Sequence, residues 1–91
     1  EIDLSKWDVS KVTNMRGLFK LAGSCSNKIS LGDLSKWDVS NVTTMREMFQ
    51  ETGRDATWYL NVSNWNVAKV TNTYRFNLKV ESKVIAPKWV N

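Results

Sequence analysis

A duplicated segment constrains the fold of this chain more than any other feature. Residues 3–19 read DLSKWDVSKVTNMRGLF, and residues 33–49 return as DLSKWDVSNVTTMREMF. A third, less regular copy covers residues 61–77 and keeps Trp65 in phase without an internal gap. Units this short cannot bury their apolar side chains alone, so successive copies must stack around a continuous core.

The spacing of the copies places the repeat boundaries. Trp7 and Trp37 are 30 residues apart, Trp37 and Trp65 are 28 apart, and the difference falls in the segments that link the copies. The chain also begins inside a repeat and without Met, so we expect a fragment of a longer protein. We predict a single repeat domain over residues 1–91, made of repeat 1 (about 1–30), repeat 2 (about 31–58), repeat 3 (about 59–80) and a capping tail (about 81–91).

Within each unit, the pattern of apolar residues predicts a short strand followed by a short helix. Trp7 and Val9 alternate with charged residues, which is typical of a strand. Val12, Met15 and Phe19 follow at spacings of three and four, which places them on one face of a helix of about two turns, with Ser10 or Thr13 as its N-cap. The expected fold is therefore α/β, a short leucine-rich-repeat-like solenoid of strand-helix repeats.

The same pattern defines the expected core. The apolar positions recur in phase from one copy to the next, so each should cover its counterpart in the neighbouring copy. The predicted core residues are Leu4, Trp7, Val9, Val12, Met15, Phe19, Leu34, Trp37, Val39, Val42, Met45, Phe49, Trp65, Val67, Val70 and Phe76.

The third copy changes character after Val70. Apolar and polar residues alternate from Tyr74 to Val80, which predicts strand where the earlier copies predict helix, and hence a β-rich C-terminal cap. In the tail, Pro87 lacks a backbone donor and would blunt an open sheet edge. Alternatively, the tail begins a fourth unit, because Lys88 and Trp89 repeat the Lys-Trp pair of the earlier copies.

Composition excludes several functional classes. The chain has no His and a single Cys, Cys25, so Ser-His-Asp sites and Cys/His metal sites lack their parts, and Cys25 is expected to be a small buried residue. No Gly-rich phosphate loop is present. Glu47, Glu51 and Asp55 have the pattern of an ordinary polar helix end. We predict no catalytic residues, no metal, no cofactor and no enzyme activity.

Charge and hydropathy bear on the partners. The net charge of +4 lies in residues 61–91, which carry five Lys or Arg and one acidic residue. Spaced single charges of this kind are usually a solvated face, so we expect no nucleic-acid partner. No apolar run approaches the roughly 20 residues that cross a bilayer, so this segment itself should not contact a membrane. We expect a monomer.

Two groups of side chains are candidates for binding. Trp58 and Tyr59 lie outside the repeat phase and, with Lys79 and Lys83, are the best candidates for a surface that contacts a partner. A covering role over the repeat core is the alternative for these two aromatic side chains, and the more common one. The acidic pairs Asp8 with Asp38 and Asp3 with Asp33 should approach one another when the copies stack, which permits calcium binding. A hydrogen-bonded turn at each Asp explains the same pattern.

The repeat resembles that of the BspA-like bacterial surface proteins, a leucine-rich-repeat-like unit of pattern L-S-x-W-D-x-S-x-V-T-x-M-x-x-M-F. Residues 33–49 carry the motif most closely, and the Cys25-Ser26 pair is similar to that family's Cys-Ser linker. The resemblance covers about residues 3–77. The spacing here exceeds the family's unit of roughly 25 residues, and the third copy lacks Met at Thr73 and Phe at Asn77.

The resemblance implies a location and a role. It implies tandem repeats on secreted, lipoprotein or cell-wall-anchored proteins of bacteria, of unknown function or linked to adhesion, and it implies no catalytic residues. The leading hypothesis is a non-catalytic module at the cell surface or outside the cell that presents a scaffold to host extracellular proteins or glycans. The alternatives are a purely structural spacer or terminal cap, and a calcium-dependent binding module.

Overall fold

The part of the chain that the structure describes has almost no regular secondary structure. The computed structural model describes residues 3–23 and 29–89, so the predictions for Cys25 and Ser26 lie outside the described residues. Its elements are a 3₁₀-helix, η1 (Leu34–Lys36), and two short strands, β1 (Leu60–Asn61) and β2 (Val84–Ile85). No α-helix occurs in these residues. The predicted solenoid of strand-helix repeats with a β-rich cap is therefore wrong.

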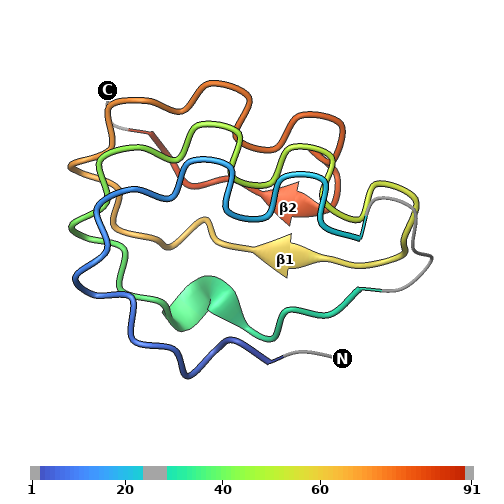
Figure 1. Ribbon diagram of the computed structural model, residues 1–91, viewed down its shortest axis with the longest axis horizontal. Helices are drawn as coiled ribbons and strands as arrows, with labels where there is room; N and C mark the ends of the chain where they lie inside the picture. Colours follow the sequence, from blue (N-terminus) through green and yellow to red (C-terminus); the bar gives the residue numbers. More distant parts are fainter. Residues whose placement is uncertain (1–2, 24–28, 90–91) are drawn as a thin grey trace.

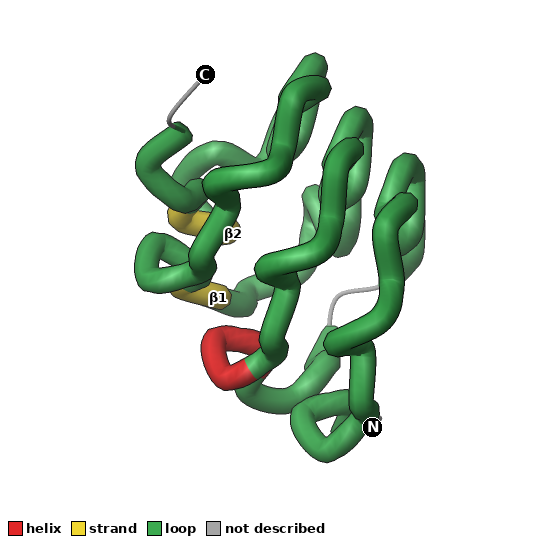
Figure 2. The backbone as a smooth tube through the Cα atoms, turned by 90° about the vertical axis from the view of Figure 1, so that its left-hand side faces the viewer, coloured by secondary structure: helices red, strands yellow, loops and turns green. Residues whose placement is uncertain are grey.

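Each copy instead forms an irregular coil, and the copies lie side by side. We call them coil 1 (residues 3–23), coil 2 (33–53) and coil 3 (61–80). Isolated parallel bridges join Asn14 to Thr44 and Thr44 to Asn72, which are equivalent positions of the three copies. Figure 1 shows the second half of each coil as a wavy track, blue, yellow-green and orange, and Figure 2 shows the coils as successive layers.

Backbone hydrogen bonds in the second half of each coil alternate between two kinds of partner. In coil 1, the N–H groups of Leu18, Lys20 and Ala22 donate to carbonyls three residues earlier in the same coil. The N–H groups of the intervening residues donate instead to coil 2, for example Phe19 N–H to Met48 O at 2.8 Å. A helix would direct every N–H along its own axis. Here half of them hold the neighbouring coil.

A four-residue period in the backbone explains why the sequence mimics a helix. Positive φ angles recur at Gly17 (63°) and Leu21 (60°), and at the equivalent Glu47 (58°) and Glu51 (56°). A turn that repeats every four residues returns side chains to the same face at i and i+4, as a helix does. Because the apolar residues keep that spacing in both structures, hydrophobic periodicity cannot distinguish them.

The core consists of aromatic rings stacked from coil to coil. The rings of Phe19 and Phe49 stack at 5.3 Å between centroids, and Phe49 meets Phe76 edge-on at 5.4 Å. Trp37 and Trp65 lie nearly parallel at 6.4 Å. All of the predicted core residues are buried except Trp7 and Val12, which lie on the uncovered side of coil 1 and are exposed and half-buried respectively.

Coil 3 keeps the turns of the other two coils, so the strand predicted from Tyr74 to Val80 is wrong as well. The alternation of apolar and polar residues from Tyr74 to Val80 comes from these turns. Phe76 occupies the position of Met48 and is buried, whereas Tyr74 points outward and is exposed. Asn77 stands where the other copies have Phe, and its side-chain amide donates to Val84 O at 2.8 Å. The substitution thus ties coil 3 to the tail.

The tail continues the stack. β2 pairs with β1 in parallel, with Leu60 opposite Val84, so β2 adds to coil 3 on the side away from coil 2. The ring of Trp89 packs edge-on against Phe76 of coil 3 at 5.1 Å, and Trp65 likewise contacts Phe49 of the coil before, in a tilted arrangement at 6.5 Å. Residues 84–89 therefore occupy the position that the first segment of a following coil would take.

Candidate binding surface

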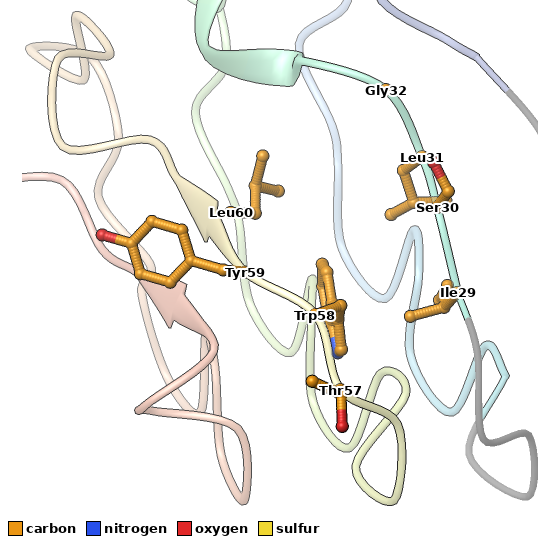
Figure 3. A pocket seen from close by; sticks show the side chains of 8 residues that line it. All are labelled: Ile29, Ser30, Leu31, Gly32, Thr57, Trp58, Tyr59 and Leu60. Atoms are coloured by element: carbon orange, nitrogen blue, oxygen red, sulfur yellow. The ribbon is translucent and has the colours of Figure 1, made fainter.

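The surface has a groove where two extended segments separate. It has a volume of 270 Å³ and is lined by residues 29–32 and 57–60 (Figure 3). Each segment is hydrogen-bonded on its far side, Leu31 O accepting from Leu4 N–H at 2.9 Å and Leu60 N–H donating to Lys83 O at 2.7 Å. Across the groove, the described residues form no backbone hydrogen bond. The two segments are thus pulled apart, which leaves the groove open.

Trp58 forms a fixed wall of this groove. Its indole Nε1 donates to Gly53 O at 3.1 Å, and the side chain is half-buried against the core. A Cβ at Gly53 would lie 2.8 Å from Trp58 Nε1 and 2.8 Å from Ile29 Cγ2, so only glycine allows this packing. Of the two roles that the sequence allowed for Trp58, binding a partner and covering the core, its packing corresponds mainly to the second.

Tyr59 stands at the rim of the groove. Its side chain is 64% exposed, and Figure 3 shows its ring pointing away from residues 29–32. The parallel register of β1 and β2 places Lys83 next to Tyr59, and Lys83 Nζ donates to Ala56 O at 2.5 Å. This hydrogen bond holds the ammonium group close to the segment that carries Tyr59.

The structure brings together three of the four residues predicted for binding. Trp58 and Tyr59 line the groove, and Lys83 lies beside Tyr59 on the side of this segment away from the groove. Lys79 lies in the turns of coil 3 with a φ of 73° and an exposed side chain. Among the residues that the structure describes, no hydrogen bond or ion pair links Lys79 to the groove. Lys79 therefore belongs to a different part of the surface.

One cluster was missed by sequence reasoning. The guanidinium groups of Arg46 and Arg75 lie 4.6 and 4.8 Å from the ring centroid of the exposed Tyr74. Each arrangement has cation–π geometry. Tyr74 replaces the Arg that the first two copies have at this position, and that replacement was the only signal in the sequence.

The repeated aspartates close local turns. Asp8 Oδ1 accepts from Ser10 N–H at 3.0 Å and from Ser10 Oγ at 2.6 Å, and Asp38 accepts from Ser40 with the same geometry. The Ser hydroxyl and then its backbone N–H hold the pKa of each carboxyl below its ordinary value. The nearby Asp8 also raises the pKa of Asp38, as a smaller contribution. Both carboxylates therefore already serve as hydrogen-bond acceptors within their own turns.

Two of the three remaining acidic residues considered, Glu47 and Glu51, form ion pairs. Glu47 Oε1 lies 3.4 Å from Lys20 Nζ, and Glu51 Oε1 lies 2.6 Å from Arg54 Nη1. Asp55 is exposed. Within residues 3–23 and 29–89, no group of three His, Cys, Asp or Glu side chains could hold a metal ion.

Comparison with known proteins identifies a family but no characterised relative. No curated protein and no solved structure matches the chain. In the described part of the chain, no helix has the length and apolar character needed to span a membrane. A family model matches residues 1–82, which include all three coils. The chain therefore belongs to the family described as "Mycoplasma protein of unknown function, DUF285".

Proposed function

We propose that this chain is a non-catalytic binding module of a bacterial surface or secreted protein, which contacts a protein or a glycan through the rim of its groove. The resemblance of the repeat to the BspA-like surface proteins supports the location. The groove, with Trp58 as its wall and Tyr59 at its rim, supports the binding role. Asp8 and Asp38 are used in turns, and Glu47 and Glu51 in ion pairs.

The observation that carries this proposal is the exposure of Tyr59. A tyrosine side chain that is 64% exposed contributes little to the stability of the core, whereas its neighbour Leu60 is buried there. Tyrosine is enriched in binding hot spots because it offers a large rigid apolar face and a hydroxyl group at small entropic cost. Protein backbones and sugar rings both use these features, so the proposal covers both.

The test measures binding of the intact chain to a panel of extracellular matrix proteins and to a glycan array. We expect at least one reproducible ligand, and at least a tenfold loss of affinity in Tyr59→Ala, because a hot-spot side chain contributes about 2 kcal/mol or more. Tyr74→Ala is the matched control. It removes another exposed tyrosine, one that two arginines already cover, and should leave the affinity unchanged.

The second candidate is a structural spacer. It is favoured by the regular stacking of the coils, in which each aromatic ring contacts its counterpart in the next coil. A spacer would show no ligand in either panel and would retain its melting temperature in Tyr59→Ala. Ligand binding that is abolished by a chelator would instead favour the calcium-dependent module, against our proposal, because Asp8 and Asp38 already accept hydrogen bonds from serine.

A further inference from the structure

Coil 1 leaves one side uncovered that coils 2 and 3 both bury. The clearest marker is the repeated tryptophan: Trp7 is 60% exposed, whereas Trp37 and Trp65 are each 5% exposed. Trp37 and Trp65 donate their indole N–H groups to the carbonyls of Leu4 and Leu34 in the coil before. Among the described residues, Trp7 has no preceding coil that could supply such a carbonyl.

The same comparison holds at two further positions of the repeat. Leu18 is 46% exposed, whereas the equivalent Met48 and Phe76 are 0% and 3% exposed. Val12 is half-buried, whereas its equivalent Val42 is fully buried. Trp7, Val12 and Leu18 are therefore apolar contacts without a partner, in the arrangement that forms the interface between coils elsewhere in this molecule.

The backbone of this side has a defined polarity. In the second half of coil 1, every second N–H from Met15 to Leu21 donates to a carbonyl of coil 2, and the accepting residues are Thr44, Arg46, Met48 and Gln50. The equivalent carbonyls of coil 1 accept no hydrogen bond within the described ranges, and they belong to Asn14, Arg16, Leu18 and Lys20. We call this side of coil 1 the acceptor face.

We propose that the acceptor face is the docking surface for a further coil of the same sequence pattern, joined on the N-terminal side of coil 1. The incoming coil would present its outward N–H groups to the four free carbonyls, as coil 1 does to coil 2. Trp7 would become buried and donate to the carbonyl at the position of Leu4. The interface continues one that this molecule already forms twice.

A second copy of this chain is a poorer occupant. Two acceptor faces brought together would place carbonyl against carbonyl, which leaves both without donors. Head-to-tail contact would require the outward side of coil 3, where β2 already pairs with β1 and Trp89 already covers Phe76. The tail thus occupies the place that the first half of coil 1 of a second copy, including Trp7, would need.

The test lengthens the whole chain by an extra copy of residues 1–30 placed ahead of residue 1. We expect the melting temperature to rise by about 5 °C or more, because stacked repeats gain stability from each new interface. The matched control is the same extension with Met15→Ser and Phe19→Ser in the added copy only, which removes the apolar contacts of that copy. It should melt with the original chain.

Replacement of the original Trp7 by Phe gives a second measure. It should leave the melting temperature of the 91-residue chain unchanged but lower that of the lengthened chain, because only there does the indole have a carbonyl to bind. An equal effect in both chains, or no gain from the extension, would overturn the proposal. So would sedimentation showing that the 91-residue chain dimerises and that Leu18→Lys abolishes the dimer, because a second copy would then be the occupant.

Discussion

The indole Nε1 of Trp65 donates a 2.8 Å hydrogen bond to the carbonyl oxygen of Leu34, in the coil before it. This bond crosses between two coils inside the core, where water does not compete. Trp65→Phe removes the donor and part of the ring, so we expect the free energy of unfolding to fall by about 1–3 kcal/mol. Chemical denaturation followed by tyrosine fluorescence or circular dichroism would measure it. In the same assay Trp7→Phe, at the equivalent position without this bond, should change stability by less than about 0.5 kcal/mol.

Phe49 lies at the centre of the ring stack. It is fully buried and contacts the rings of Phe19 and Phe76 on its two sides. Phe49→Ala should therefore cost about 3–5 kcal/mol, a large part of the stability of a domain of this size. Calorimetry should show a loss of the cooperative transition or a melting temperature far below that of the parent chain. A fall of only a few degrees would contradict the packing described.

Gly17 isolates the effect of backbone conformation. Its φ is 63°, and an added Cβ would meet nothing nearer than Lys20 Cβ at 4.0 Å, so Gly17→Ala introduces backbone strain without a clash. We expect a loss of about 1 kcal/mol in the free energy of unfolding. Leu21→Gly, at the next position of positive φ, should cost less than a typical exposed Leu→Gly change. Equal stability of Gly17→Ala and the parent would argue against the turn.

Acid should destabilise the chain through its aspartate turns. Hydrogen bonds from serine lower the pKa of Asp3, Asp8, Asp33 and Asp38 in the folded chain from the ordinary value of 3.8. A carboxyl with a depressed pKa in the folded state stabilises it above the unfolded pKa, and this contribution is lost as the pH falls through 3.8 towards the folded value.

The melting temperature should therefore be nearly constant between about pH 5 and 7 and drop between about pH 4 and 2. The double variant Ser10→Ala and Ser40→Ala, which removes the hydroxyl donors of two turns, should show a smaller drop over the same interval. Identical acid profiles for this variant and the parent would assign the drop to general charge repulsion.

Circular dichroism tests the backbone directly. Because the described residues form no α-helix and only two short strands, the far-ultraviolet spectrum should lack the double minimum of a helix. A helical spectrum would favour the strand-helix repeats that the sequence predicted.

The sequence predicted which side chains face the core better than it predicted the backbone that carries them. Met45 and Phe49 are both buried, because a turn of four residues and a helix both bring every fourth side chain to the same face. The two backbones differ in their φ angles. Glu47 and Glu51 adopt positive φ although neither is glycine, and stacking between coils imposes this against local preference.

The candidate surface was predictable only in part. Trp58 and Tyr59 were recognised because they break the repeat phase, and both line the groove. The groove itself could not be predicted. It lies between two segments that are each hydrogen-bonded to a different neighbour, one to coil 1 and the other to the tail. The Arg46–Tyr74–Arg75 cluster was missed because it depends on which side chains the turns direct outward.

The alternating hydrogen bonds also limit how such a chain can change length. Deleting one residue between Met15 and Leu21 would redirect every later N–H, so donors now aimed at coil 2 would turn inward and their neighbours outward. The φ pattern would be restored only after four residues. Insertions and deletions inside the turns should therefore survive in steps of four, whereas the connections between coils can vary freely, as the spacings of 30 and 28 residues between the tryptophans already do.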